Sequence, residues 1–225
     1  GGLGWVFILF GNLYWLGSLP LEYYSPETFG FLSIYGIPHL AMARGLILIS
    51  LRLYLSNQAN KFHGLVIGSL GILAGLFQPL AMVIIGVVIG THLVVMFLWY
   101  GRSTNNGHSD FSDSWKRQFK IAVISGLIML PVVGYNLIIM RKDPYVRLWT
   151  QQNIISSPHP FHYFLAYGLL IPFAIIGARS LLREYPREGL LPVVWVALLP
   201  FLAYFPFNLQ RRLPDGKWIV LLTLA

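Results

Sequence analysis

The stretch FNLQRRLPDGKW places two adjacent arginines between two apolar runs. An arginine side chain can bind phosphate oxygens through two parallel hydrogen bonds. The Pro-Asp-Gly that follows predicts a turn, which would fix the path of the loop. The pattern therefore predicts that Arg211 and Arg212, with Gln210 beside them, grip a lipid phosphate or pyrophosphate at a membrane surface. The competing interpretation is that both arginines reach the headgroups and only anchor a span end.

Four other side chains are candidates for the same binding site. Arg141 and Arg147 lie in RKDPYVRLW, a second basic loop, and could assist the arginine pair. His39 and Arg44 lie near the start of an apolar run that opens with IPHLAMARG. His39 could contact a substrate or headgroup, or cap the helix. Arg44 could face a cavity or extend to the membrane surface.

Candidates for acid–base chemistry are few. The catalytic residues stay unknown, and only Glu22 and Glu27, in the aromatic segment LEYYSPETFGF, are weak candidates. His159 and His162 are separated by Pro160, and a zinc site needs three or four ligands, so we predict no metal site there. The sequence indicates no cofactor and leaves open whether a divalent metal ion binds. The absence of cysteine excludes disulfides and thiolate nucleophiles.

The composition indicates the elements that must position these residues. The chain is 56% hydrophobic and 11% charged, and its mean hydropathy is +0.65. A soluble domain carries about a quarter charged residues. Long apolar runs in lipid must form helices, because lipid offers no partners for the backbone. We therefore predict an all-α, polytopic transmembrane helical bundle, and no motif indicates nucleic-acid binding.

Counting the apolar runs predicts about seven spans and the start of an eighth in one transmembrane domain over residues 1–225. The runs are 5–19, 38–56, 64–77, 80–99, 121–140, 164–182 and 190–207, with 218–225 as the incomplete one. Residues 100–120 read as a hydrophilic cytoplasmic loop and residues 141–163 as an external loop. The glycines Gly68, Gly71 and Gly75 share one helical face, which predicts close helix packing. His92, in the middle of a run, is expected to be a hydrogen-bonded core histidine.

The positive charges orient this topology by a small margin. The side assigned to the cytoplasm carries Lys61, Arg102, Lys116, Arg117, Lys120, Arg183 and Arg187. The external side carries Arg141, Lys142, Arg147, Arg211, Arg212 and Lys217. Because topology does not require positive charge on the external side, a binding role for these arginines gains support.

Several segments in order carry a family resemblance: IPHLAMA, GILAGLFQPLAMV, HPFHYFLAYGLLIPFAIIGA and LPFLAYFPFNLQRRLPDG. The sequence resembles bacterial membrane glycosyltransferases of the GT-C class, relatives of polyprenyl-phosphate-dependent mannosyl- and arabinosyltransferases. The resemblance implies a piece of a longer membrane domain in the bacterial plasma membrane, with a polyprenyl-phosphate-linked sugar as donor. It implies that Arg211 and Arg212 hold the donor phosphate. The aspartate that such enzymes use in their first external loop would lie upstream of Gly1.

Two other function classes stay open. A non-catalytic accessory subunit of a respiratory or photosynthetic complex would use its aromatic, glycine-rich spans to pack against other transmembrane subunits. A secondary transporter is the third possibility, but no internal repeat is visible and Arg44 is the only charge well inside a run. Membrane lipids are expected partners in each case.

Overall fold

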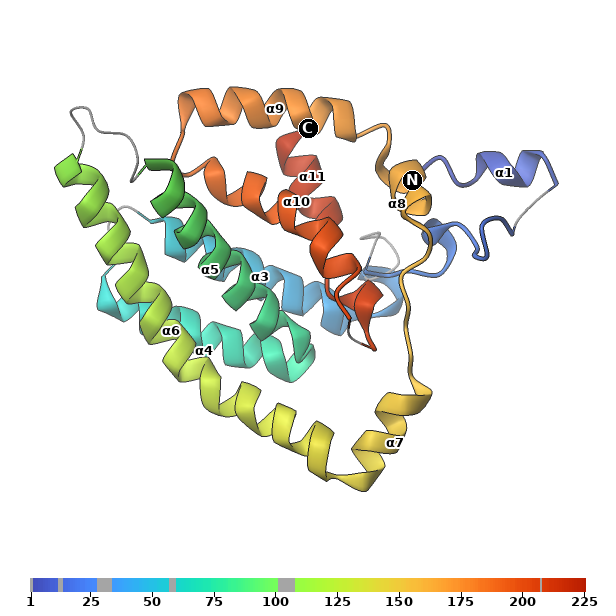
Figure 1. The fold of residues 1–225 in the computed structure, drawn as a ribbon, viewed down its shortest axis with the longest axis horizontal. Helices are drawn as coiled ribbons and strands as arrows, with labels where there is room; N and C mark the ends of the chain where they lie inside the picture. The colour runs from blue at the N-terminus through green and yellow to red at the C-terminus, as the bar shows by residue number, and fades with distance from the viewer. Residues whose placement is uncertain (1, 12–13, 28–33, 57–59, 101–107, 207) are drawn as a thin grey trace. The chain divides into compact units, whose positions relative to one another are not determined.

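The computed structural model describes residues 2–11, 14–27, 34–56, 60–100, 108–206 and 208–225 (Figure 1). These residues form helices joined by turns and loops, and their one β contact is an isolated bridge between Trp15 and Ser18. The prediction of an all-α fold is confirmed. The chain divides into two compact units, the first made of Gly1–Ala41 and Asn153–Ala225 and the second of Met42–Gln152.

The second unit consists of four long helices and one short one. Its elements are α3 (Pro38–Leu55), whose first four residues belong to the first unit, α4 (Lys61–Phe77), α5 (Leu80–Tyr100), α6 (His108–Lys142) and α7 (Pro144–Gln152). Asn60 caps α4 by accepting a hydrogen bond from the Phe62 N–H (2.9 Å), which satisfies one of the unpaired donors of the first turn. Gln78 ends α4, and Pro79 separates it from α5.

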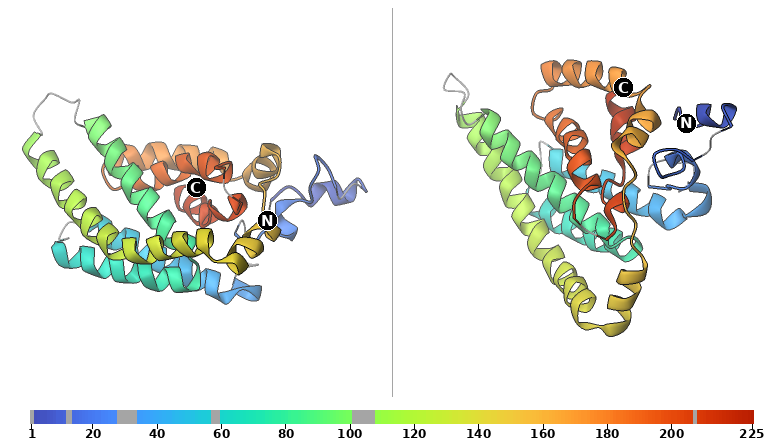
Figure 2. Two further views of the ribbon diagram at one scale, coloured as in Figure 1. Left: turned by 60° about the horizontal axis from the view of Figure 1, so that its bottom comes forward. Right: turned by 45° about the vertical axis from the view of Figure 1, so that its right-hand side comes forward.

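Helices α4 and α6 lie side by side along a face of glycines (Figures 1 and 2). The close contacts pair Gly64 with Ile124, Gly68 with Ile128, Gly71 with Met129, and Gly75 with Met82 of α5. A Cβ added at Gly68 would lie 2.7 Å from Ile128 Cβ, so only glycine permits this approach. The predicted close packing through these glycines is confirmed. The paired residue numbers rise together along α4 and α6, so these two helices run parallel.

One buried polar pair joins α3 to α5. The Tyr54 hydroxyl lies 2.9 Å from His92 Nδ1, and both side chains are fully buried. Their rings meet edge to face, with centroids 5.5 Å apart. The expectation that His92 is a hydrogen-bonded core histidine is confirmed.

The first unit is made of shorter pieces. Its elements are α1 (Val6–Leu9), η1 (Leu21–Tyr23), α8 (Pro160–Tyr167), α9 (Ile171–Glu184), α10 (Leu190–Ala203), η2 (Gln210–Arg212) and α11 (Lys217–Leu224). Helix α9 packs on α11 so closely that a Cβ at Gly177 would overlap the Leu224 carbonyl oxygen. The predicted Pro-Asp-Gly turn is present, and Gly216 adopts a φ of 81°, which glycine reaches without strain.

The expectation of about seven spans is wrong for the described residues. Two helical stretches, Leu80–Trp99 and Ser112–Lys142, are long and apolar enough to cross a membrane. A third exists if α8 and α9, which meet at a bend of 75°, count as one broken span. By length and composition, the structure therefore supports a helical protein with two or three membrane-compatible segments.

The overcount arises because an apolar run need not form one long helix. In the described part of run 5–19, the structure has the four-residue α1 and a bridged turn. Helices α4 and α10 have 17 and 14 residues, fewer than the ~20 that a span needs. Helix α3 reaches 18 residues but carries Arg44 and Arg52. Run 164–182 is divided because α8 ends at Tyr167 and α9 begins at Ile171, with Pro172 in its first turn.

The two long loops of the prediction are partly helical. Of the segment 100–120, residues 101–107 lie outside the described residues, and the remainder from His108 belongs to α6. The segment 141–163 contains the end of α6, all of α7 and the start of α8. The Asp143 carboxylate starts α7 by accepting the Tyr145 and Val146 N–H groups at 2.8 and 3.1 Å.

Candidate functional site

The candidate site lies in the first unit, around η2. Backbone hydrogen bonds hold this short helix against the chain that precedes α8. The Ile155 N–H donates to the Asn208 carbonyl (2.7 Å), and the Arg211 N–H donates to the Ile155 carbonyl (3.3 Å). These bonds fix the backbone from which the two arginine side chains extend.

Arg212 meets one of the two acidic candidates. Its Nε lies 3.4 Å from Glu27 Oε1, in an ion pair whose carboxylate side chain is 4% exposed. The Ser25 hydroxyl donates to the other carboxylate oxygen at 3.2 Å. A buried carboxylate needs such partners, because burial without them is costly. The structure thus brings together Glu27 and Arg212, which the sequence had offered as separate candidates.

Arg211 contacts an aromatic ring of the same acidic segment. Its guanidinium carbon lies 4.6 Å from the centre of the Tyr24 ring, within the range of a cation–π interaction. The Tyr24 hydroxyl is held 2.8 Å from the Ser18 hydroxyl. The two neighbouring arginines therefore have different surroundings: Arg212 faces a carboxylate, and Arg211 faces a ring.

Gln210 connects the arginines to α8 through Ser157. The Ser157 N–H donates to Gln210 Oε1 (3.3 Å), and the Ser157 hydroxyl donates to the Ala203 carbonyl (2.5 Å). A hydroxyl has one proton to donate, so the Tyr163 hydroxyl, 3.1 Å away, donates to the serine oxygen. This fixes the phenol of Tyr163 beside η2.

Tyr204 packs beside Tyr163 in the same region. Its hydroxyl donates to the Pro158 carbonyl at 2.6 Å, and its ring meets Tyr163 edge to face with centroids 6.3 Å apart. Burial raises the pKa of Tyr204, because the phenolate would lose solvation. Its hydroxyl is therefore a neutral donor at physiological pH.

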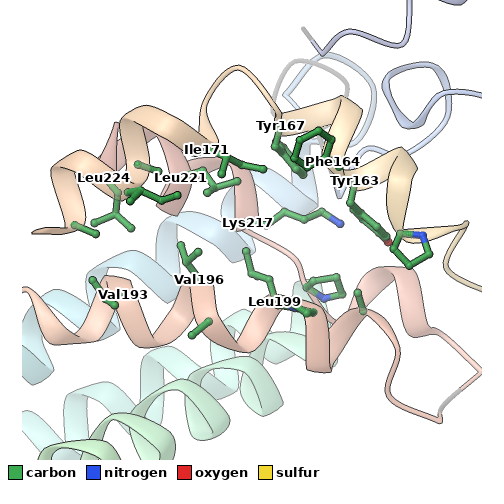
Figure 3. Close-up of a pocket in the computed structure, with 18 of the residues that line it drawn as sticks. Tyr163, Phe164, Tyr167, Ile171, Val193, Val196, Leu199, Lys217, Leu221 and Leu224 are labelled. Carbon is green, nitrogen blue, oxygen red and sulfur yellow. The ribbon is translucent and has the colours of Figure 1, made fainter. Parts of the chain in front are cut away.

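A cavity of about 540 Å³ begins at Tyr163 and continues between α8, α9, α10 and α11 (Figure 3). Most of its lining is aliphatic or aromatic, with Phe164, Val196 and Leu221 among the contributors. The exception is Lys217, which is 2% exposed and holds its ammonium 4.6 Å from the centre of the Tyr163 ring. The volume falls within the usual range of ~300–1,000 Å³ for small-molecule pockets.

The other acidic candidate is engaged elsewhere. Glu22 accepts a hydrogen bond from the Gly4 N–H at 2.7 Å, which ties η1 to the residues before α1. Among the described contacts, none joins Glu22 to the arginine pair.

Of the remaining binding candidates, one lies in the first unit and three lie in the second. His39 is exposed in the first turn of α3. Arg44 belongs to the second unit and is 3% exposed, so its side chain is buried within the fold. Arg141 and Arg147 are exposed residues of the second unit, on α6 and α7.

The two histidines of SSPHPFHYF have local partners. His159 caps α8 by accepting the Phe161 N–H at 3.3 Å, and His162 Nε2 lies 3.0 Å from the Trp15 carbonyl. No group of three metal-ligating side chains occurs among the residues that the structure describes.

Sequence reasoning missed three members of this region: Ser157, Tyr163 and the cavity-facing role of Lys217. Lys217 was visible only as one external charge among several. The sequence signal that could have found it is its position directly after the Pro-Asp-Gly turn, at the first residue of an apolar run. Nothing in the sequence indicates that Ser157 joins Gln210 to Tyr163.

Taken together, cationic and hydroxyl groups lie beside an apolar cavity, connected by short contacts. Such an arrangement suits an amphiphile with an anionic head, because the cations meet the charge and the cavity takes the chain. No family model, no curated protein and no solved structure matches this chain.

Proposed function

We propose that this chain is part of a membrane-embedded GT-C-class glycosyltransferase of the bacterial plasma membrane, which uses a polyprenyl-phosphate-linked sugar as donor. The observation that supports the proposal most is the Glu27–Arg212 ion pair, linked through η2, Gln210 and Ser157 to the apolar cavity. It provides a carboxylate that can act as a base and a pair of cations at one end, and room for an isoprenoid chain at the other. The resemblance of FNLQRRLPDG to this class adds to it.

In this proposal, each group has a defined role. Arg211 and Arg212 hold the donor phosphate, whose charge attracts Arg212 more strongly than a single carboxylate does. Glu27, released from Arg212, accepts the proton of the acceptor hydroxyl. The acceptor oxygen then forms a bond to the anomeric carbon, the bond from that carbon to the phosphate oxygen breaks, and the lipid phosphate leaves with the electron pair, stabilised by the arginines.

Donor binding by the double variant Arg211→Ala/Arg212→Ala tests the proposal. Each charge-assisted contact is worth about 1.5–3 kcal/mol, so we expect affinity for polyprenyl phosphate to fall about 100-fold or more. The matched control is Arg179→Ala/Arg183→Ala, two exposed arginines of α9 in the same unit, which should change affinity little. A folded double variant with unchanged affinity would rule out the phosphate-binding role.

The accessory-subunit alternative is favoured by a different observation. Both acidic candidates already have partners, Glu22 with a backbone N–H and Glu27 with Arg212. In that case the Glu27–Arg212 pair is structural. Glu27→Gln distinguishes the two functions, because it should abolish sugar transfer in the enzyme while leaving lipid-phosphate binding in place.

A further inference from the structure

The second unit contains a cluster of cations that the proposed function does not use. It borders a cavity of about 390 Å³ formed by the start of α4 and the first part of α6. The lining residues are Asn60, Lys61, Lys116, Arg117, Lys120 and Ile121. Four of these six carry positive charge, and all six lie within the second unit.

The packing of α4 on α6 creates this cluster. Because the two helices run parallel through their glycine contacts, Lys61 at the start of α4 lies at the same level as the part of α6 just before Ile121. The amino end of α4 adds the partial positive charge of its helix dipole. Asp113 is the one acidic side chain that a described ion pair brings here, 4.0 Å from Lys116 Nζ, and both groups are largely exposed. Such an exposed pair neutralises little.

The cluster also has a definite place along the helix. The stretch of α6 from Ile121 to Met140 has 20 residues, and at ~1.5 Å per residue it matches a hydrocarbon core of ~30 Å. Lys120 is the residue immediately before that stretch. Trp115 and Phe119 stack on each other at 5.0 Å between ring centroids, and aromatic side chains favour the headgroup level of a membrane.

We propose that this basic cavity binds the headgroup of a phospholipid that carries two phosphates. The three lysines and one weakly paired carboxylate alone leave a local charge of about +2, which a single phosphate does not match. A headgroup with two phosphates supplies two anionic groups for the lysines and Arg117, while its acyl chains lie along the apolar faces that begin at Ile121. This site is independent of the donor site in the first unit.

The test measures lipid binding to the purified chain in neutral detergent by native mass spectrometry. The probes are cardiolipin, phosphatidylglycerol and sodium pyrophosphate. We expect cardiolipin to bind about tenfold more tightly than phosphatidylglycerol. Lys120→Gln should weaken cardiolipin binding about fivefold, and Lys116→Gln/Lys120→Gln about 30-fold, since each cation near a membrane surface contributes a similar share.

The matched control is Lys142→Gln, which removes an exposed lysine at the opposite end of α6 and should change affinity less than twofold. Lys116→Arg/Lys120→Arg keeps the charge and should retain the binding. Equal cardiolipin affinity in the wild type and the Lys116→Gln/Lys120→Gln variant would overturn the proposal. Pyrophosphate binding as tight as that of cardiolipin would overturn it too, because the ligand would then be a soluble diphosphate.

Discussion

The two units of the chain are built in contrasting ways. Apart from the short α7, the second unit consists of long helices, with 35 residues in α6, and α4 approaches its neighbours through glycines. The first unit consists of helices of 14 residues or fewer among its described elements, held by turns, backbone hydrogen bonds and polar pairs. The first kind of construction makes a scaffold, whereas the second brings side chains distant in sequence to one place. Clusters that can do chemistry arise more readily from the second.

The largest effect should come from the tightest contact of the first unit. We expect Gly177→Ala to destabilise the protein by about 3 kcal/mol, because the new methyl group would meet the Leu224 backbone carbonyl, which cannot rotate away. Unfolding in detergent followed by circular dichroism measures this. Gly36→Ala, at an open position of the same unit, is the control and should have little effect. Equal stability of the two variants would mean that α9 and α11 are not in close contact.

A substitution on the glycine face of the second unit should lower the unfolding free energy less. Gly68→Ala places a methyl group 2.7 Å from Ile128 Cβ, a contact that a small separation of α4 and α6 relieves, so we expect a loss of about 2 kcal/mol. Gly86→Ala on α5, with open space around it, should leave the unfolding free energy nearly unchanged. If Gly68→Ala proved more damaging than Gly177→Ala, the assignment of the rigid contact to the first unit would fail.

The ion pair of the first unit should show a smaller effect. Arg212→Ala removes the charged partner of the buried Glu27, and we expect a loss of about 1.5 kcal/mol, because the Ser25 hydroxyl still bonds the carboxylate and the arginine is partly exposed. Combining Arg212→Ala with Glu27→Ala should lower the unfolding free energy by less than the sum of the losses in the two single variants. Strict additivity in this double-mutant cycle would show that the two side chains do not interact.

The smallest expected effect belongs to the polar pair of the second unit. Tyr54→Phe removes the hydroxyl that faces His92 and keeps the ring in place, so we expect a loss of about 1 kcal/mol. The same unfolding assay measures it. Tyr135→Phe, at an exposed tyrosine of α6, is the matched control. A Tyr54→Phe variant as stable as this control would contradict the hydrogen bond.

Much of the second unit was predictable, because its signals are local. The glycine spacing of GSLGILAGLF puts Gly68, Gly71 and Gly75 on one face, and the structure packs that face on a neighbour. The apolar runs 80–99 and 121–140 became parts of α5 and α6, because no charge or proline cluster interrupts them. Pro131 lies inside α6 without ending it.

The first unit was less predictable, because hydropathy does not reveal where an apolar run bends or stops. The sequence identified Arg212 and Glu27 as separate candidates, but 185 positions separate them, and no local pattern indicates that they meet. The contacts of Ser157 and Lys217 are likewise tertiary. The sequence thus predicts the residue types of the site, while the folding of short helices decides their neighbours.

The bend between α8 and α9 has a consequence for hydration. Where a helix turns by 75°, carbonyls of its last turn lose their helical partners. The Tyr167 carbonyl accepts the Leu170 N–H at 2.8 Å instead, but Pro172 has no N–H to offer the Gly168 carbonyl. In hydrocarbon, the Gly168 carbonyl therefore needs water or another polar group as its partner. Tyr167, the neighbour of Gly168, lines the cavity, so this bend is where an otherwise apolar chamber favours a polar contact.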